Sequence, residues 1–284
     1  MVLEALITPR LAERKPWQLF FIGIFYSTIA MFLSLWIFQE HASLVMVFLT
    51  VLACVPLMYK TMRLEEKKER INEKAIDELK EHWPALVFFV ALFLGFVVSY
   101  AVWYVFLPAH LVESLFSTQA STINAINAKI HYVYTANSVT AYISGGAVFA
   151  KIFTNNIKVL FFCVFFSFFY GAGAIFILTW NASVIATAVG NFIRENLSDV
   201  FGWSYFAVFS IGFMRYMTHG IFEILAYFMG GLAGGIISVA VIRHDFSSKR
   251  FRHIIFDSFD LIILAVFTLF IAAIIEVFVT PSLF

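Results

Sequence analysis

The feature that most constrains the fold is a series of apolar runs about as long as a membrane is thick. A helix rises about 1.5 Å per residue, so about 20 apolar residues cross a hydrocarbon core of about 30 Å. With 62% hydrophobic and only 13% charged residues, the chain does not resemble a soluble domain. We predict an all-α, polytopic transmembrane helical bundle of about six to seven membrane helices. The clearest runs are residues 17–38, 42–59, 84–107, 157–180 and 261–279.

A further apolar region, residues 203–242, is about 40 residues long, which is too long for one span. Thr218, His219 and Gly220 interrupt it, so we predict a broken or re-entrant pair of helices around His219-Gly220. Basic residues favour the cytoplasmic side of a membrane. Arg194 and the basic link at residues 243–253 are therefore expected on the same side, which requires an even number of crossings between them.

The distribution of charge divides the chain into three parts. Residues 1–60 are expected to form an N-terminal transmembrane hairpin, and residues 61–83 a charged cytoplasmic amphipathic helix. Residues 84–284 form the membrane core, with an extracytoplasmic segment at residues 108–151 that holds few basic residues. The sequence thus predicts a multi-pass protein of the cell membrane, with a cytoplasmic N-terminus and an extracytoplasmic C-terminus.

Three ionisable residues inside the longest apolar region form the main candidate site. Arg215, His219 and Glu223 are spaced four apart, so a helix places them on consecutive turns of one face. Ionisable residues inside a membrane are costly and tend to be functional. A structural role is equally expected, in which Arg215 and Glu223 neutralise one another through or around His219.

Small and polar residues mark further positions in the apolar runs. Asn155 and Asn156 either cap the helix that follows them or take part in a site. Asn181 begins a small, polar stretch that suggests a second discontinuous helix, an architecture that many transporters use. Several glycines allow close helix packing, within one chain or across a homodimer, and they are Gly171, Gly173, Gly230, Gly231, Gly234 and Gly235.

Several classes of function are disfavoured. The formal net charge of +1 gives no reason to expect a nucleic-acid partner. No nucleophile elbow, phosphate-binding loop or cysteine nucleophile with a helper histidine is visible, so we expect no enzyme and no cofactor. His219 and Glu223 have metal-ligand spacing but lack the rest of a zinc motif. An intramembrane metal-dependent hydrolase is therefore a weak alternative, and we predict no metal site.

The order of these elements resembles the stage II sporulation protein M family of integral membrane proteins. The resemblance covers roughly residues 84–284 and rests on Asn155-Asn156, on the glycines of the following run, on Leu178-Thr179-Trp180-Asn181, and on His219-Gly220 with Glu223 and the glycines after it. This chain departs from many relatives in having Thr218 before the His-Gly pair and Ala182 after Asn181. The shared residues are expected to be Asn155, Asn156, His219, Gly220 and Glu223.

The resemblance implies a non-enzymatic membrane protein. The namesake of the family works in spore formers as an anchoring or scaffold subunit beside cell-wall hydrolases, although many relatives belong to organisms that make no spores. We expect a scaffold or assembly subunit in membrane or envelope remodelling, with the lipid bilayer and membrane or extracytoplasmic proteins as partners. The alternative is a transporter or channel for a small solute, ion or lipid that uses Arg215, His219 and Glu223.

Overall fold

The computed structural model is helical throughout the part of the chain that it describes, which comprises residues 15–69, 78–136, 141–170, 173–197, 204–243, 246 and 248–283. Seven of these helices are long and apolar enough to cross a membrane, in agreement with the predicted polytopic bundle. The helices are α3 (Trp17–Ile37), α4 (Ala42–Glu69), α5 (Glu78–Phe106), α6 (Ala109–Ala136), α7 (Ala141–Tyr170), α8 (Ala174–Leu197), α9 (Ser204–Arg243), α10 (Lys249–Ile274) and α11 (Thr280–Leu283). A 3₁₀ turn, Gln39–His41, joins α3 to α4, and a π-helical turn, Ile275–Val279, joins α10 to α11.

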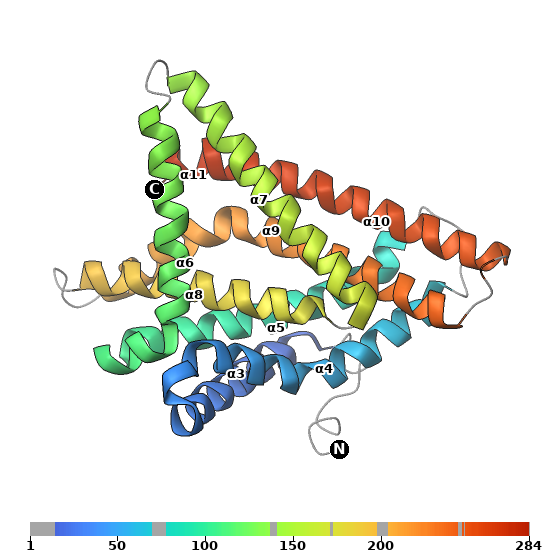
Figure 1. The fold of residues 1–284 in the computed structure, drawn as a ribbon, viewed down its shortest axis with the longest axis horizontal. Helices are drawn as coiled ribbons and strands as arrows, with labels where there is room; N and C mark the ends of the chain where they lie inside the picture. Colours follow the sequence, from blue (N-terminus) through green and yellow to red (C-terminus); the bar gives the residue numbers. More distant parts are fainter. Residues whose placement is uncertain are drawn as a thin grey trace.

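The spanning helices run back and forth between two ends of the bundle, and α6 lies across them at one end (Figure 1). Helix α6 contacts α4, α7 and α8. Two exposed tryptophans lie at the two ends of α3: Trp17 is 60% exposed and Trp36 is 81% exposed. They mark the two edges of the apolar surface of this helix. Their separation of 19 residues corresponds to about 28 Å of helix. Aromatic rings at both ends of such a belt are typical of the two membrane–water interfaces.

The predicted break at His219-Gly220 is wrong, because α9 is one continuous helix of 40 residues. A glycine inside a helix costs only about 1 kcal/mol, which tertiary packing readily offsets. The Thr218 hydroxyl donates to the Met214 carbonyl within the same helix, so it does not interrupt the backbone ladder. In the most apolar stretch of α9, 83% of the residues are buried, whereas in the corresponding stretches of α7 and α10 only 22% are buried. Helix α9 is therefore the central element around which the other helices pack.

The apolar run at residues 157–180 contains a turn that the sequence did not reveal. Helix α7 ends at Tyr170 and α8 begins at Ala174, so the run belongs to two different helices. Gly173 lies in this turn, where an added Cβ would be 2.3 Å from the Phe166 carbonyl oxygen. Gly173 therefore serves the turn itself, whereas we had assigned it to helix packing, and Gly171 lies outside the described residues.

This turn also changes the number of membrane crossings that precede Arg194, because α8 becomes a separate crossing helix. The guanidinium of Arg194 donates a hydrogen bond to the carbonyl of Leu107 at the α5–α6 junction. Arg194 therefore lies at the α6 end, whereas the link that begins after Arg243 lies at the other end of α9 (Figure 1). The expectation that Arg194 and the basic link share one side is wrong, because α9 alone crosses between them, where two segments were expected.

Helix α8 is also continuous, so the second discontinuous helix predicted after Asn181 is absent from its described residues. Its polar side chains bond back to carbonyls in the preceding turn: Asn181 to Ile177 at 2.7 Å and Thr187 to Ser183 at 2.8 Å. These local bonds satisfy the polar groups without loosening the helix. Asn181 thus has a local role.

The charged segment predicted at residues 61–83 falls partly on two helices. Residues 61–69 continue α4 and residues 78–83 begin α5, while residues 70–77 lie outside the described residues. The two helices are joined there by a buried contact of 2.7 Å between Glu65 Oε2 and His82 Nδ1. This end of the α4–α5 pair is therefore held by a polar contact as well as by apolar packing.

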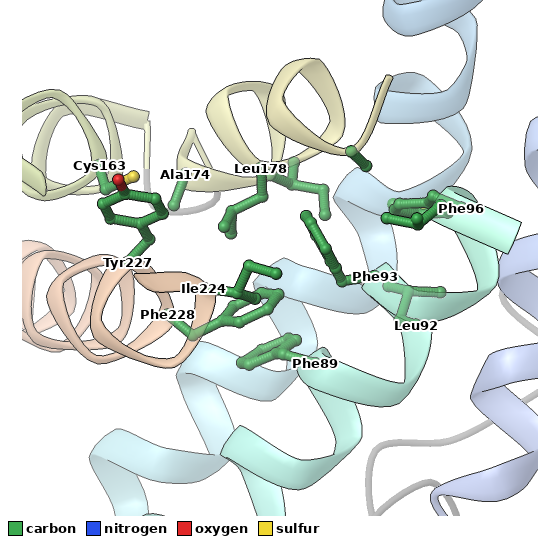
Figure 2. Close-up of a cluster of buried hydrophobic side chains, with 14 of the residues drawn as sticks. Phe89, Leu92, Phe93, Phe96, Cys163, Ala174, Leu178, Ile224, Tyr227 and Phe228 are labelled. Atoms are coloured by element: carbon green, nitrogen blue, oxygen red, sulfur yellow. The ribbon is translucent and has the colours of Figure 1, made fainter. Parts of the chain in front are cut away.

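Aromatic rings and glycines hold the core together. Phe89 of α5 stacks on Phe228 of α9 with ring centroids 5.2 Å apart (Figure 2). Between α9 and α7, an added Cβ at Gly234 would be 2.5 Å from the Val164 carbonyl oxygen. Added Cβ atoms at Gly230 and Gly231 would also clash, with Leu160 and Ala174, and Gly235 is buried beside them. These glycines therefore pack helices within one chain.

Candidate functional site

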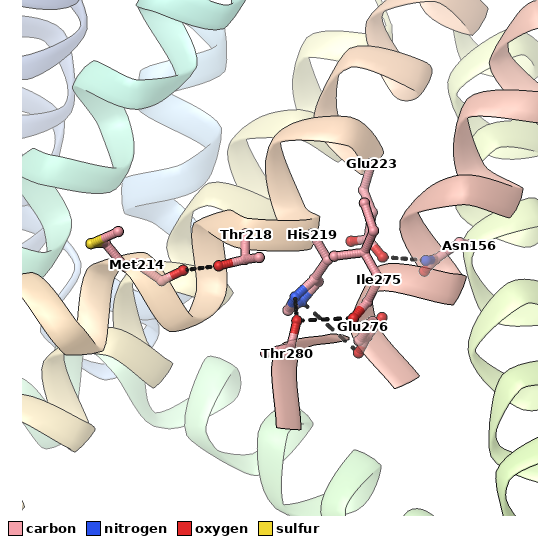
Figure 3. A network of polar contacts seen from close by, with 8 residues as sticks. All are labelled: Asn156, Met214, Thr218, His219, Glu223, Ile275, Glu276 and Thr280. Atoms are coloured by element: carbon pink, nitrogen blue, oxygen red, sulfur yellow. Dashed lines mark hydrogen bonds and ion pairs between the residues drawn. The ribbon is translucent and has the colours of Figure 1, made fainter. Parts of the chain in front are cut away.

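The candidate site lies where the middle of α9 meets the end of α10. His219 and Glu223 project from successive turns of α9 toward Glu276 and Thr280 (Figure 3). His219 Nε2 lies 4.0 Å from Glu276 Oε1, and His219 Nδ1 lies 3.4 Å from the Thr280 hydroxyl. The imidazole is thus held between a carboxylate and a hydroxyl, and its side chain is 15% exposed.

Two carboxyl groups lie near each other in this site. Glu223 and Glu276 are close enough to interact electrostatically. Two ionised carboxylates repel one another, so a proton or a cation bound between them stabilises the pair. The Asn156 amide of α7 donates to Glu223 Oε1 from the other side. The site therefore joins α7, α9 and the C-terminal turn of α10 through groups that can bind a proton or a cation.

A local change of helical geometry places Glu276. The last turns of the C-terminal span, Ile275–Val279, are π-helical, and Glu276 lies in them. The Thr280 hydroxyl donates to the Ile275 carbonyl at 3.2 Å, and thus it spans the wider turn. Single π-helical turns inside longer helices are frequent at functional sites. This turn brings Thr280 back toward His219.

Arg215 does not pair with Glu223 as predicted. Its guanidinium lies 6.0 Å from the centroid of the Phe192 ring of α8. Two helical turns separate Arg215 from Glu223, about 12 Å along the axis, and Glu223 turns instead toward Asn156 and Glu276. In the described part of the chain, neither carboxyl group of the site forms an ion pair with a lysine or an arginine.

A partly open cavity of about 390 Å³ lies beside Glu276, and Glu223 is not among its lining residues. Arg215, Tyr216, His219, Glu276 and Thr280 supply its polar groups. The rest of its lining is apolar, with Ile123 of α6, three residues of α8 and Pro281. Volumes of this order are typical of sites for small ligands. The site is therefore accessible to a small molecule and is not sealed among helices.

The structure brings together only some of the residues predicted from sequence. Asn156, His219 and Glu223 meet, and Arg215 lines the same cavity. Asn155 is exposed, and neither asparagine is a helix cap, because both lie well inside α7. Gly220 is buried, yet an added Cβ would lie 3.7 Å from Met217 Cε, so no close approach requires glycine there.

Sequence reasoning missed Glu276 and Thr280 as members of the site. The available signal was an acidic residue inside the last apolar run. Among the described residues, no group of three His, Cys, Asp or Glu side chains has an arrangement that could hold a metal ion.

The fold and the site define a polytopic helical membrane protein with an acid–base cluster between its helices. The family model of stage II sporulation protein M matches residues 85–281, which is most of the chain. The protein therefore belongs to the stage II sporulation protein M family. No curated protein and no solved structure matches the chain.

Proposed function

We propose that this protein binds a small polar solute in the cavity beside Glu276 and carries it across the membrane, while Glu223 and Glu276 exchange a proton or a cation. The observation that carries the proposal is that Glu223 and Glu276 lie close enough to interact electrostatically and that Glu276 lines an open cavity. No lysine or arginine of the described chain neutralises them. The pair therefore depends on an exchangeable positive charge.

The cost of the site argues for a role beyond packing. A charged residue inside a membrane-spanning segment is costly, up to about 2.5–3.5 kcal/mol at the helix centre on insertion scales. Apolar residues of similar volume often stabilise a buried position at least as well as an ion pair does. Uptake of a proton or a cation removes the repulsion between Glu223 and Glu276, so occupancy of the pair can favour one arrangement of α9 and α10 over another.

Proteoliposomes test the proposal directly. Purified protein should support a flux of protons, cations or small polar solutes, measured with an internal pH dye or with labelled solutes. The variants Glu276→Gln and Glu223→Gln should lower that flux at least tenfold. Lys158→Gln is the matched control, because Lys158 is exposed on α7 and does not line the cavity. Equal flux in wild-type protein and in both glutamate variants would contradict the mechanism.

A scaffold or assembly role is the second candidate, and α6 favours it. Its buried face includes Leu115, Phe116 and Gln119, and Gln119 donates to the Ser43 carbonyl and the Ser183 hydroxyl. Its exposed face is polar and includes Ser117 and Ser121. A transverse helix fixed to the bundle in this way offers a stable surface for another protein.

Site-specific cross-linking tests this second role. A photoreactive residue at Ser121 should give a discrete adduct with a partner protein in membranes of the source cells. The same residue at lipid-facing Phe25 of α3, which is 52% exposed, should not. The absence of any protein adduct from the whole exposed face of α6 would count against a scaffold role.

For both roles we propose the same orientation. The end that carries the basic link after Arg243 faces the cytoplasm, because basic residues are enriched there in membrane proteins. Helix α6 and the C-terminal turn at Glu276 then lie toward the extracytoplasmic side. The cavity is therefore expected to load from that side.

A further inference from the structure

The cavity next to the carboxyl pair carries charges of both signs. Arg215 of α9 and Glu276 of the π-helical turn line the same space of about 390 Å³. His219 lies one helical turn from Arg215 and within 4.0 Å of Glu276. Neither Arg215 nor Glu276 is paired with an opposite charge from Lys, Arg, Asp or Glu in the described part of the chain. The two charges are thus available to a ligand.

The chemistry of the two groups differs in a way that selects a ligand. A guanidinium presents a planar fork of donors that matches a carboxylate. The ring of Phe192 lies 6.0 Å from the Arg215 guanidinium and limits its orientation. Glu276 can accept from an ammonium group, and the Thr280 hydroxyl beside it can accept a further hydrogen bond. A carboxylate therefore suits one part of the cavity and an ammonium the other.

The remaining wall defines the rest of the ligand. Ile123, Val184, Ile185 and Ala188 supply apolar lining, and Tyr216 and Pro281 complete it. This part of the lining can receive an uncharged side chain and holds no further Lys, Arg, Asp or Glu. The volume lies near the lower limit for ligand pockets, which are usually about 300–1,000 Å³. It suits a single small metabolite better than a peptide or a lipid.

We propose that the cavity binds a zwitterionic amino acid with an uncharged side chain, whose carboxylate contacts Arg215 and whose ammonium contacts Glu276. The inference rests on the proposed solute-carrier function and names the solute class. The ligand neutralises both charges of the cavity at once, which neither a simple cation nor a simple anion does. His219 lies between the two ends and acts as a positioning residue.

Calorimetry on purified full-length protein in nanodiscs tests the inference. The probes are glycine, leucine and phenylalanine, together with leucinamide, which keeps only the ammonium, and N-acetylleucine, which keeps only the carboxylate. We expect at least one of the three amino acids to bind about 10- to 100-fold more tightly than either leucine derivative, because each loses one charged hydrogen bond.

Two variants test which residue contacts the carboxylate of the ligand and which contacts its ammonium group. Arg215→Gln should weaken binding of the amino acid by the same factor and leave leucinamide binding unchanged, whereas Glu276→Gln should weaken both. Lys158→Gln should bind all probes as the wild type does, and circular dichroism should show that every variant is folded. Binding that follows this pattern supports the inference.

Other outcomes overturn the inference, and they separate it from the proposed function. If leucinamide binds as tightly as leucine, or if none of the three amino acids binds, the assignment of Arg215 to a carboxylate is wrong. A glutamate-dependent proton or cation flux in proteoliposomes would then still support the carrier function. If that flux is also absent, both proposals fail.

Discussion

Gly220 and Gly234 lie on the same helix but in different packing environments, and replacing each by alanine separates packing from helix propensity. A methyl group at Gly234 would lie 2.5 Å from the Val164 carbonyl oxygen and 3.1 Å from Ser167 Cβ. The first of these atoms belongs to the backbone of α7, so the two helices must move apart. At Gly220 the nearest atom is Met217 Cε at 3.7 Å, an ordinary contact.

The expected difference in stability between the two variants follows from two free-energy contributions, of which they share only the first. Both exchange glycine for alanine inside a helix, which stabilises the helix by about 0.5–1 kcal/mol. Overpacking a well-packed interface costs about 1–3 kcal/mol, and only Gly234→Ala has this cost. The propensity gain cancels in the comparison, so Gly220→Ala should be more stable than Gly234→Ala by about 1–3 kcal/mol. The Gly220→Ala variant should be at least as stable as the wild-type protein.

Thermal unfolding in detergent, followed by intrinsic tryptophan fluorescence, measures this difference. At about 2–4 °C per kcal/mol, the two apparent unfolding temperatures should differ by about 2–12 °C. The unfolding temperature of Gly230→Ala should lie between those of the other two variants. The added methyl group would lie 2.3 Å from the Leu160 side chain, which can rotate away. Equal unfolding temperatures for the Gly220 and Gly234 variants would refute the close approach of α9 to α7.

Three further predictions concern the site and the topology. Asn156→Leu should destabilise the protein by about 1–3 kcal/mol, because it leaves Glu223 without its amide donor, and Asn155→Leu on the exposed face should change the unfolding temperature little. Single cysteines at Asn196 and Ser248 should react with an impermeant maleimide from opposite sides of sealed vesicles, since they lie at opposite ends of the bundle. If both react from the same side, the number of crossings between Arg194 and the basic link is even, as the sequence had suggested. The native Cys54 and Cys163 are buried and should stay unlabelled in intact membranes. Gly173→Ala should lower the unfolding temperature, because the added methyl group meets the Phe166 backbone at the α7–α8 turn, and an unchanged value would argue against that geometry.

The sequence was sufficient to predict the helical class, because runs of about 20 apolar residues have few other folds open to them. It was insufficient at the run that spans residues 157–180, whose length matches one membrane helix although it holds the end of α7 and the start of α8. Gly173, which lies in the turn between them, is small and gives no hydropathy signal. Its position in the fold, and not its residue type, makes it a turn residue.

The candidate site was predicted in part for a related reason. His219 and Glu223 stood out because they share a helix face four residues apart, which is local information. Glu276 is more than 50 residues away in sequence, and its place depends on how α10 packs on α9. The pairing of Arg215 with Glu223 failed because spacing on one helix cannot show which neighbour a side chain prefers across helices. Asn156 was singled out, but its partner could not be predicted.

The position of the α3–α4 hairpin gives the chain a modular plan. Residues 85–281 match the family, and every residue that forms the acid–base cluster or lines the cavity beside it lies within that range. The hairpin packs against α5 through the close approach of Gly23 to Gly95 and supplies no atom to the cavity. Sequence changes in the hairpin can therefore tune how the protein sits among lipids or neighbouring proteins while the chemistry of the core stays the same.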